Sequence, residues 1–362
     1  MSQPTPRFQL QFLKNIQRLL SEGRFTASYK YALLMSLADV AVERGDDSGK
    51  ALTISTKSLA EKFIQYYWRQ ALPYLPRGRS RDGKVLQQNT DRQAKIITVL
   101  GDAHQAYGGS LSAAKRDAKV WKSLVSQVDQ VVRGMPLWKL QTVGNTEFDF
   151  LYENVGKGKT VELKAGVTFC LRQFHGLIGD LVRGAWVRFI RGTKQNQDVL
   201  GTTVDLYEFL FGSDRSGLST MVPILIEIQK GNCVYCHKSM ARRIAHVDHF
   251  IPWSRYPVDL GHNFVLAHDT CNAAKSDHIA AAGHLDAWVE RNDRCGTELT
   301  SAFHDRGVLH DLPTTLRIAD WTYSQIAMAN GLTWEKGRTM VPLCGDWERE
   351  LRELRELIEK AA

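Results

Sequence analysis

Cysteine and histidine residues in the second half of the chain have the spacing of a metal site. Two residues separate Cys233 from Cys236, and two separate His268 from Cys271. Two such pairs can bind one tetrahedral Zn²⁺ from two sides, whereas a single pair would be weak evidence. Three other histidines could replace His268 as the fourth ligand, but none has its spacing to Cys271: His237, His246 and His262. The spacing therefore predicts a structural zinc.

A second group of polar residues lies between these ligands and beside them. His246, Asp248 and His249 fall within the apolar alternation IAHVDHFI, which predicts a strand. On a regular strand His246 and Asp248 share one face and His249 points to the other. Asn263 begins the next apolar run, and Asn272 directly follows the last cysteine, where a helix is expected to start. This order of strand, loop, strand and helix is too small to bury a core, so a bound metal would stabilise it.

These residue types suit the hydrolysis of a phosphodiester bond. Such a reaction needs a base that works near pH 7 and a cation beside the developing charge. Histidine has the unperturbed pKa that suits the base. A carboxylate and an amide oxygen suit a hard divalent ion such as Mg²⁺ or Mn²⁺.

Residues 230–280 resemble the HNH (ββα-metal, or His-Me finger) endonuclease family of the zinc-framed type. The signature of that family is an Asp-His pair, a central Asn and a terminal Asn or His, which here are Asp248-His249, Asn263 and Asn272. The chain departs from many zinc-framed members in having His268 where they have Cys. The resemblance implies that His249 is the general base, that Asp248 and Asn272 bind the catalytic Mg²⁺ or Mn²⁺, and that Asn263 braces the loop and orients His249.

The resemblance implies a metal-dependent endonuclease that acts on nucleic acid, with DNA as the expected substrate and restriction or phage defence as the expected role. One such site cuts one strand per event, so cleavage of both strands would need a homo-oligomer, a second site or a second binding event. A regulatory protein partner is a further expectation. The alternative is a non-catalytic, zinc-stapled module that binds nucleic acid or protein.

The net charge of +8 favours contact with a polyanion. Six side chains are candidates for contacts to nucleic acid, with ordinary solvated surface charge as the alternative: His246, Arg255, Lys275, Arg77, Arg79 and Arg81. Tyr66, Tyr67 and Trp68 could stack on bases, although aromatic clusters more often belong to a core. A rival catalytic site of the restriction type would use Asp149, Glu162 and Lys164.

Composition indicates a globular cytoplasmic protein. Hydrophobic residues make up 43% of the 362 residues, and the six cysteines are dispersed rather than arranged as a disulfide framework. The first residues do not have the pattern of a signal peptide, and no apolar run is long enough to cross a membrane.

The expected fold class is mainly α with some β structure (α+β). We expect a helical region at residues 1–135 and a hairpin with helices at 136–230, packed with the first region. Part of the first region is compatible with a winged-helix element that reads DNA, and a plain helical scaffold is the preferred alternative. The hairpin would pair TEFDFLYE with TVELKA across NVGKGK. The HNH module with its zinc would span 231–285, and a C-terminal helical region would span 286–362. One face of the last helix is lined by Trp347, Leu351, Leu354 and Ile358. This face could pack on the body of the protein or on a second subunit, and packing on the body is the preferred prediction.

Overall fold

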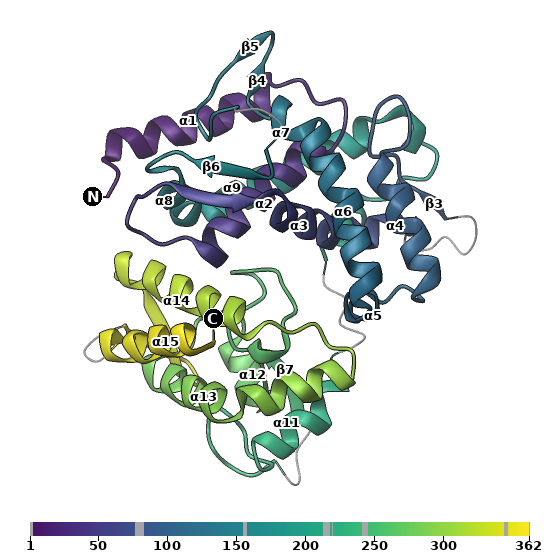
Figure 1. Cartoon of the computed structure of the whole chain (residues 1–362). Coiled ribbons are helices and arrows are strands. Elements are labelled where there is room, and N and C mark those ends of the chain that lie inside the picture. Colours follow the sequence, from purple (N-terminus) through teal and green to yellow (C-terminus); the bar gives the residue numbers. More distant parts are fainter. Residues whose placement is uncertain are drawn as a thin grey trace. The chain divides into compact units, whose positions relative to one another are not determined.

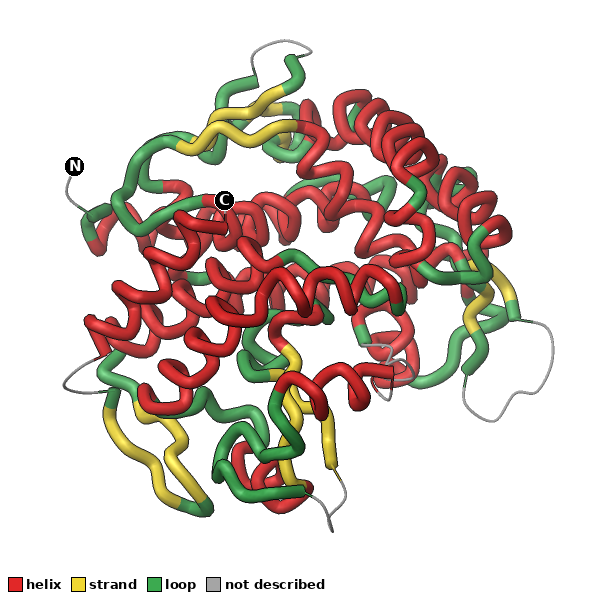
Figure 2. Tube along the Cα trace, turned by 60° about the horizontal axis from the view of Figure 1, so that its bottom comes forward, coloured by secondary structure: helices red, strands yellow, loops and turns green. Residues whose placement is uncertain are grey.

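The computed structural model describes residues 3–76, 83–154, 158–212, 218, 220–240, 245–343 and 347–361. The chain divides into two compact units, Met1–Gly212 and Ser213–Ala362, which are described separately below. Helices dominate both units, and strands occur as short pairs (Figure 2). The predicted mainly α fold with small sheets is therefore confirmed. The boundaries at 135, 230 and 285 stay predictions.

The first unit is a helical body with short strand pairs at its surface (Figure 1). Its helices are α1 (Pro6–Glu22), α2 (Tyr29–Arg44), α3 (Thr56–Trp68), α4 (Lys95–Ala106), α5 (Leu111–Arg116), α6 (Ala118–Gly134), α7 (Pro136–Lys139), α8 (Val167–Gln173), α9 (His175–Gly192) and α10 (Thr203–Phe211). Its strands are β1 (Leu52–Ser55), β2 (Pro73–Tyr74), β3 (Lys84–Val85), β4 (Thr142–Val143), β5 (Thr146–Glu147) and β6 (Thr160–Leu163).

Helix α2 forms the centre of the first unit. Nearly all of its residues are buried, and it packs against α3, α8 and α9. Two of its charged residues pair with neighbours. Glu43 pairs with Lys62 of α3, and Asp39 accepts a hydrogen bond from His175 Nε2 at 2.8 Å. A helix that is apolar on all sides is expected to be buried in this way.

The hairpin predicted between residues 146 and 165 is wrong in its pairing. Strand β6 pairs antiparallel with β1, which lies more than a hundred residues earlier, with Ile54 opposite Val161. A single bridge between Tyr152 and Leu163 is what remains of the expected pairing. The small hairpin of this region is instead β4–β5, which turns at residues 144 and 145.

The segment that suggests a winged helix contains strand β1, which is followed directly by helix α3. The Ser55 side chain caps α3 by accepting a hydrogen bond from the Ser58 amide at 3.1 Å. Tyr67 and Trp68, at the end of α3, are buried in the core of the first unit, which agrees with the core alternative rather than with base stacking. A DNA-reading role for β1 and α3 stays a prediction.

In its described residues, the second unit has helices and two strand pairs. Its helices are α11 (Val222–Ile228), α12 (Asp269–Lys275), α13 (Ala282–Asp305), α14 (Leu312–Met328) and α15 (Trp347–Ala361), with a short 3-10 turn η4 (Gly261–Asn263). Its strands are β7 (Ala245–His249), β8 (Phe264–His268), β9 (Leu332–Lys336) and β10 (Thr339–Pro342). The β9–β10 hairpin was not predicted from the sequence.

The last helix packs on its own unit. Leu351, Leu354 and Ile358 of α15 are buried, and α15 contacts α14 and α13. Packing on the body was the preferred prediction for this face, and it is confirmed. In the described part of the chain the cysteines are free thiols, and none of the helices there combines the length and apolar character that a bilayer span requires.

Candidate metal centre and catalytic site

The strand pair β7–β8 and helix α12 form the frame of the candidate site. In the antiparallel pair, Asp248 lies opposite Val265 and His249 lies opposite Phe264. Helix α12 begins directly after the last residue of β8. No loop separates the two elements, so the helix lies close to the hairpin. The order of strand, loop, strand and helix is the one that the apolar patterning predicted.

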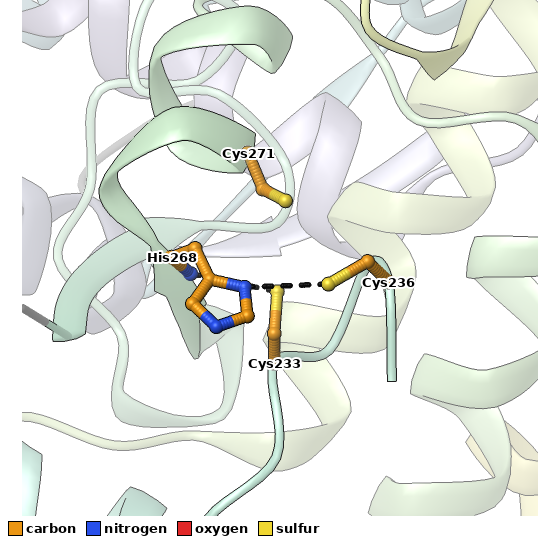
Figure 3. A group of neighbouring side chains, drawn as sticks. All are labelled: Cys233, Cys236, His268 and Cys271. Atoms are coloured by element: carbon orange, nitrogen blue, oxygen red, sulfur yellow. Dashed lines mark hydrogen bonds between the residues drawn. The ribbon is translucent and has the colours of Figure 1, made fainter. Parts of the chain in front are cut away.

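The four predicted zinc ligands converge beside this frame. Their potential ligand atoms all lie within 4.8 Å of one another, and Cys236 Sγ lies 3.3 Å from His268 Nδ1. A tetrahedral Zn²⁺ with ordinary bond lengths sets neighbouring ligand atoms about 3.5–3.8 Å apart. Figure 3 shows the side chains of Cys233, Cys236, His268 and Cys271 gathered around a common space. Two loop cysteines thus meet the end of β8 and the first turn of α12, and the cluster indicates zinc binding.

The electrostatics of the cluster also suit a cation. Burial raises the pKa of Cys236, but hydrogen bonds from the Lys238 amide, Cys233 and His268 outweigh it and bring this pKa down to about 7. Burial and the neighbouring Cys233 and Cys236 raise the pKa of Cys271 to about 12. Crowded thiolates repel one another until a divalent ion binds them, which then favours the deprotonated form of each.

The carbonyl of Ser239 orients the fourth ligand. His268 Nε2 lies 3.3 Å from this oxygen, which can only accept a hydrogen bond. The proton therefore belongs on Nε2, and the lone pair of Nδ1 is directed toward the cysteines. This arrangement fits zinc coordination through Nδ1.

Asp248 is buried at the centre of a hydrogen-bonded group. Tyr235 donates its hydroxyl to Asp248 Oδ2 at 2.6 Å, and Lys275 Nζ lies 3.1 Å from the same oxygen. Lys275 Nζ also donates to the carbonyl oxygen of His249 at 2.9 Å. Burial lowers the pKa of Lys275, and burial together with Asp248 raises the pKa of Tyr235 well above its ordinary value. Lys275, a candidate phosphate contact, is thus fully buried and paired with Asp248.

His249 lies at the end of β7, and its side chain contacts Asp259 rather than the group around Asp248. Its Nε2 is 2.7 Å from Oδ1 of Asp259, and its ring packs edge-on against Phe264. A carboxylate on one ring nitrogen fixes the orientation of an imidazole and leaves the other nitrogen available for proton transfer. This geometry is chemically suited to a general base.

Asn263 braces the loop that follows β7. Its side chain accepts a hydrogen bond from the Ile251 amide at 2.8 Å and donates to the Ile251 carbonyl at 2.9 Å. Arg291 of α13 holds the other side of this segment, because its guanidinium donates to the carbonyls of His262 and Phe264. Burial lowers the pKa of Arg291 to about 10. The loop is thus fixed by buried polar groups on both sides.

The remaining predicted residues are distributed around this centre. Asn272 is half-buried on α12, and its side chain makes no hydrogen bond to any residue that the structure describes. His246 and Arg255 are exposed. Arg77, Arg79 and Arg81 lie outside the described residues. The structure therefore brings Asp248, Lys275 and the backbone of His249 into direct contact, without a hydrogen bond between Asn272 and Asp248.

Three further residues were not singled out from the sequence. Tyr235 lies between the two cysteines of the first pair, so its closeness to the site could have been anticipated from position alone. Asp259 and Arg291 carry no such signal, because Asp259 lies in an irregular loop and Arg291 on a helix after the motif.

The rival arrangement around Asp149 does not form a comparable group. Lys164 Nζ donates to the main-chain carbonyl of Asp149 at 2.7 Å, and Glu162 is an exposed residue of β6. Over the described ranges, the zinc cluster is the only group of three or more Cys, His, Asp or Glu side chains placed to share an ion.

Comparison with known families matches two segments of the chain. Residues 233–278 match the HNH endonuclease family, which confirms the resemblance over that segment and indicates a nuclease-type or nucleic-acid-associated function. Residues 9–210 match a family described as a domain of unknown function (DUF8808). No curated protein and no solved structure matches the chain.

Proposed function

We propose that this chain, which belongs to the DUF8808 family, is a metal-dependent endonuclease that hydrolyses phosphodiester bonds of DNA through its HNH segment. The observation that carries this proposal is the position of His249. Its imidazole is held by Asp259 at the end of β7, one residue after the buried carboxylate of Asp248. A base and a potential metal ligand thus project from adjacent positions of one strand.

Each residue of the HNH signature has a role in this proposal. His249 would remove the proton from the attacking water, and Asp248 and Asn272 would hold Mg²⁺ or Mn²⁺ on the scissile phosphate. Asn263 would keep the loop in place, and the zinc would keep α12 against the hairpin. His246 and Arg255 are exposed on the same module and would contact the nucleic acid backbone.

One observation favours the alternative of a non-catalytic binding module. The Asp248 oxygen that accepts from Tyr235 is also paired with Lys275, so this carboxylate already has two partners. Catalysis would require the carboxylate to bind a cation in addition to Lys275 or in its place. A binding module would need no such exchange.

The decisive experiment compares the zinc-loaded protein with its His249→Ala variant. We expect the wild type to nick supercoiled plasmid and to cut single-stranded DNA with Mg²⁺, Mn²⁺ or Ni²⁺, and the variant to lose at least a hundred-fold in rate, because general-base catalysis contributes about 10²–10⁴-fold. His278→Ala is the matched control, because His278 is an exposed histidine of the same module. If wild type and His249→Ala leave both DNAs equally intact with every metal, the binding module is the correct interpretation.

Two further comparisons refine the proposal. A parallel assay with RNA of the same sequence measures the preference for DNA. Restriction or phage defence is the role proposed with this activity, and it predicts fewer phage plaques on cells that express the wild type than on cells that express His249→Ala. Equal plaque numbers would remove the defence role and leave the enzymatic proposal to the cleavage assay.

A further inference from the structure

A cavity of about 400 Å³ in the first unit is lined by basic, hydroxyl and apolar side chains. It lies between the segment that joins α1 to α2, helix α7 and the β4–β5 turn. Its lining residues include Arg24, Thr26, Tyr29, Lys30, Met135 and Lys139. Cavities of this size are typical of sites for small molecules. The cavity belongs to the DUF8808 segment and is independent of the HNH residues.

The charges that face this cavity are all positive. Arg24, Lys30 and Lys139 line it, and the lining contains no Asp or Glu. Among the residues that the structure describes, none of the three forms an ion pair with a carboxylate. Three cations around one concave space create a field that attracts an anion.

Lys30 differs from the other two cations of the cavity because it is buried. Only 9% of the residue is exposed, and its Nζ has a weak contact with the Thr142 carbonyl at 3.5 Å and lies 5.3 Å from the centre of the Phe25 ring. Burial, and then repulsion from Lys139, lower the pKa of Lys30 to about 8. Buried lysines are normally paired with a carboxylate, so the partner of this one is expected to come from outside the chain.

We propose that this cavity binds a phosphorylated small molecule of nucleotide size. The phosphate would lie among Lys30, Lys139 and Arg24, whose ammonium and guanidinium groups form charge-assisted hydrogen bonds with phosphate oxygens. Thr26 and the apolar surface of Met135 and Pro136 would contact the rest of the ligand. A concave site with one buried cation suits a compact phosphate better than an extended polymer backbone.

The test is a calorimetric titration of the full-length protein with inorganic pyrophosphate, ADP, GDP and a linear dinucleotide. We expect at least one of these probes to bind in the micromolar range. Lys139→Gln and Lys30→Met should each lower the affinity for that probe at least ten-fold. The matched control is Lys122→Gln, which removes an exposed lysine of α6 outside the cavity and should leave binding unchanged.

Proton uptake gives a second readout that a structural role would not produce. The other titratable residues that line the cavity are Arg24, Lys139 and Tyr29, and the Tyr29 hydroxyl accepts a hydrogen bond from the Ile96 amide at 3.2 Å. A bound anion raises the pKa of Lys30, so binding somewhat above pH 8 should take up a proton. Titrations in buffers of different ionisation enthalpy measure this uptake, and Lys139→Gln should retain it while Lys30→Met should lose it.

Three outcomes would overturn the proposal. The first is that no probe binds tighter than millimolar. The second is that Lys122→Gln weakens binding as much as Lys139→Gln does. The third is that the cavity variants bind duplex DNA more weakly but bind every small probe as the wild type does. The cavity would then be a contact site for the nucleic acid backbone. His249→Ala should bind the probe like the wild type, so failure of the nuclease proposal leaves this test intact.

Discussion

Replacement of Lys275 by methionine should destabilise the second unit unless a divalent cation is present. Lys275 Nζ lies 3.1 Å from Oδ2 of Asp248, and the Lys275 and Asp248 side chains are 0% and 10% exposed. Methionine keeps most of the buried apolar stem but removes the charge. The carboxylate of Asp248 would then be buried with the Tyr235 hydroxyl as its remaining partner.

The size of the effect follows from the geometry of the pair. At 3.1 Å and an effective dielectric constant of about 20, two unit charges attract by about 5 kcal/mol. Loss of one partner of a buried ion pair typically costs about 3–5 kcal/mol. We expect a loss of about 3 kcal/mol in the free energy of unfolding, because the hydrogen bond from Tyr235 remains. Millimolar Mn²⁺ should restore part of this loss by binding Asp248 in place of the ammonium.

The assay is urea unfolding of zinc-loaded protein, with and without Mn²⁺. Lys238→Met is the control, because Lys238 is exposed in the same module. The double variant with Asp248→Asn should be more stable than Lys275→Met alone, since it no longer buries an unpaired charge. Wild-type stability of Lys275→Met without Mn²⁺ would refute the reasoning, and so would a deficit that neither Mn²⁺ nor Asp248→Asn reduces.

Three other changes have defined outcomes. Cys233→Ser should lower the zinc content and the melting temperature, whereas Cys295→Ser should retain zinc at the wild-type ratio, as measured by elemental analysis. Gly261→Ala should lower the free energy of unfolding by about 1–3 kcal/mol, because its methyl group would lie 2.5 Å from Cδ2 of Phe303 on α13. Gly283→Ala places its methyl group in open space and should leave the melting temperature unchanged or slightly raised. Burial lowers the pKa of His262 to about 4, so the unfolded chain binds a proton more readily. The contribution of His262 to stability should therefore be complete above about pH 7 and fall by about 2 kcal/mol between about pH 7 and pH 5. His262→Gln should flatten that slope in urea titrations.

The spacing of residues along the chain predicted those parts of the site whose side chains come from neighbouring positions in the sequence. The two pairs of zinc ligands converge because each pair lies on a turn or at a strand–helix junction, where two intervening residues bring the side chains together. The alternation around Asp248 predicted its strand for the same reason, since side-chain direction along a strand has a period of two.

Contacts set by the path of a loop could not be predicted in this way. Asp259 reaches His249 only because ten residues of irregular chain return to the end of β7. The sequence predicts Lys275 at the surface or on a phosphate, but α12 packs against β7 and the Lys275 side chain is buried beside Asp248. The β1–β6 pairing was also missed, because a plausible local partner for β6 obscured a distant one.

That distant pairing has a consequence for how the chain leaves the ribosome. Residues 52–55 are synthesised more than a hundred positions before residues 160–163, so the earlier strand emerges without its neighbour. Until that neighbour appears, its amide edge is open to other polypeptides. Pairs with such wide separation along the chain also slow folding, because a large loop must close first. Nascent chains halted before residue 160 should therefore be recognised by chaperones or proteases, and those halted beyond residue 212 should be released as a protected unit.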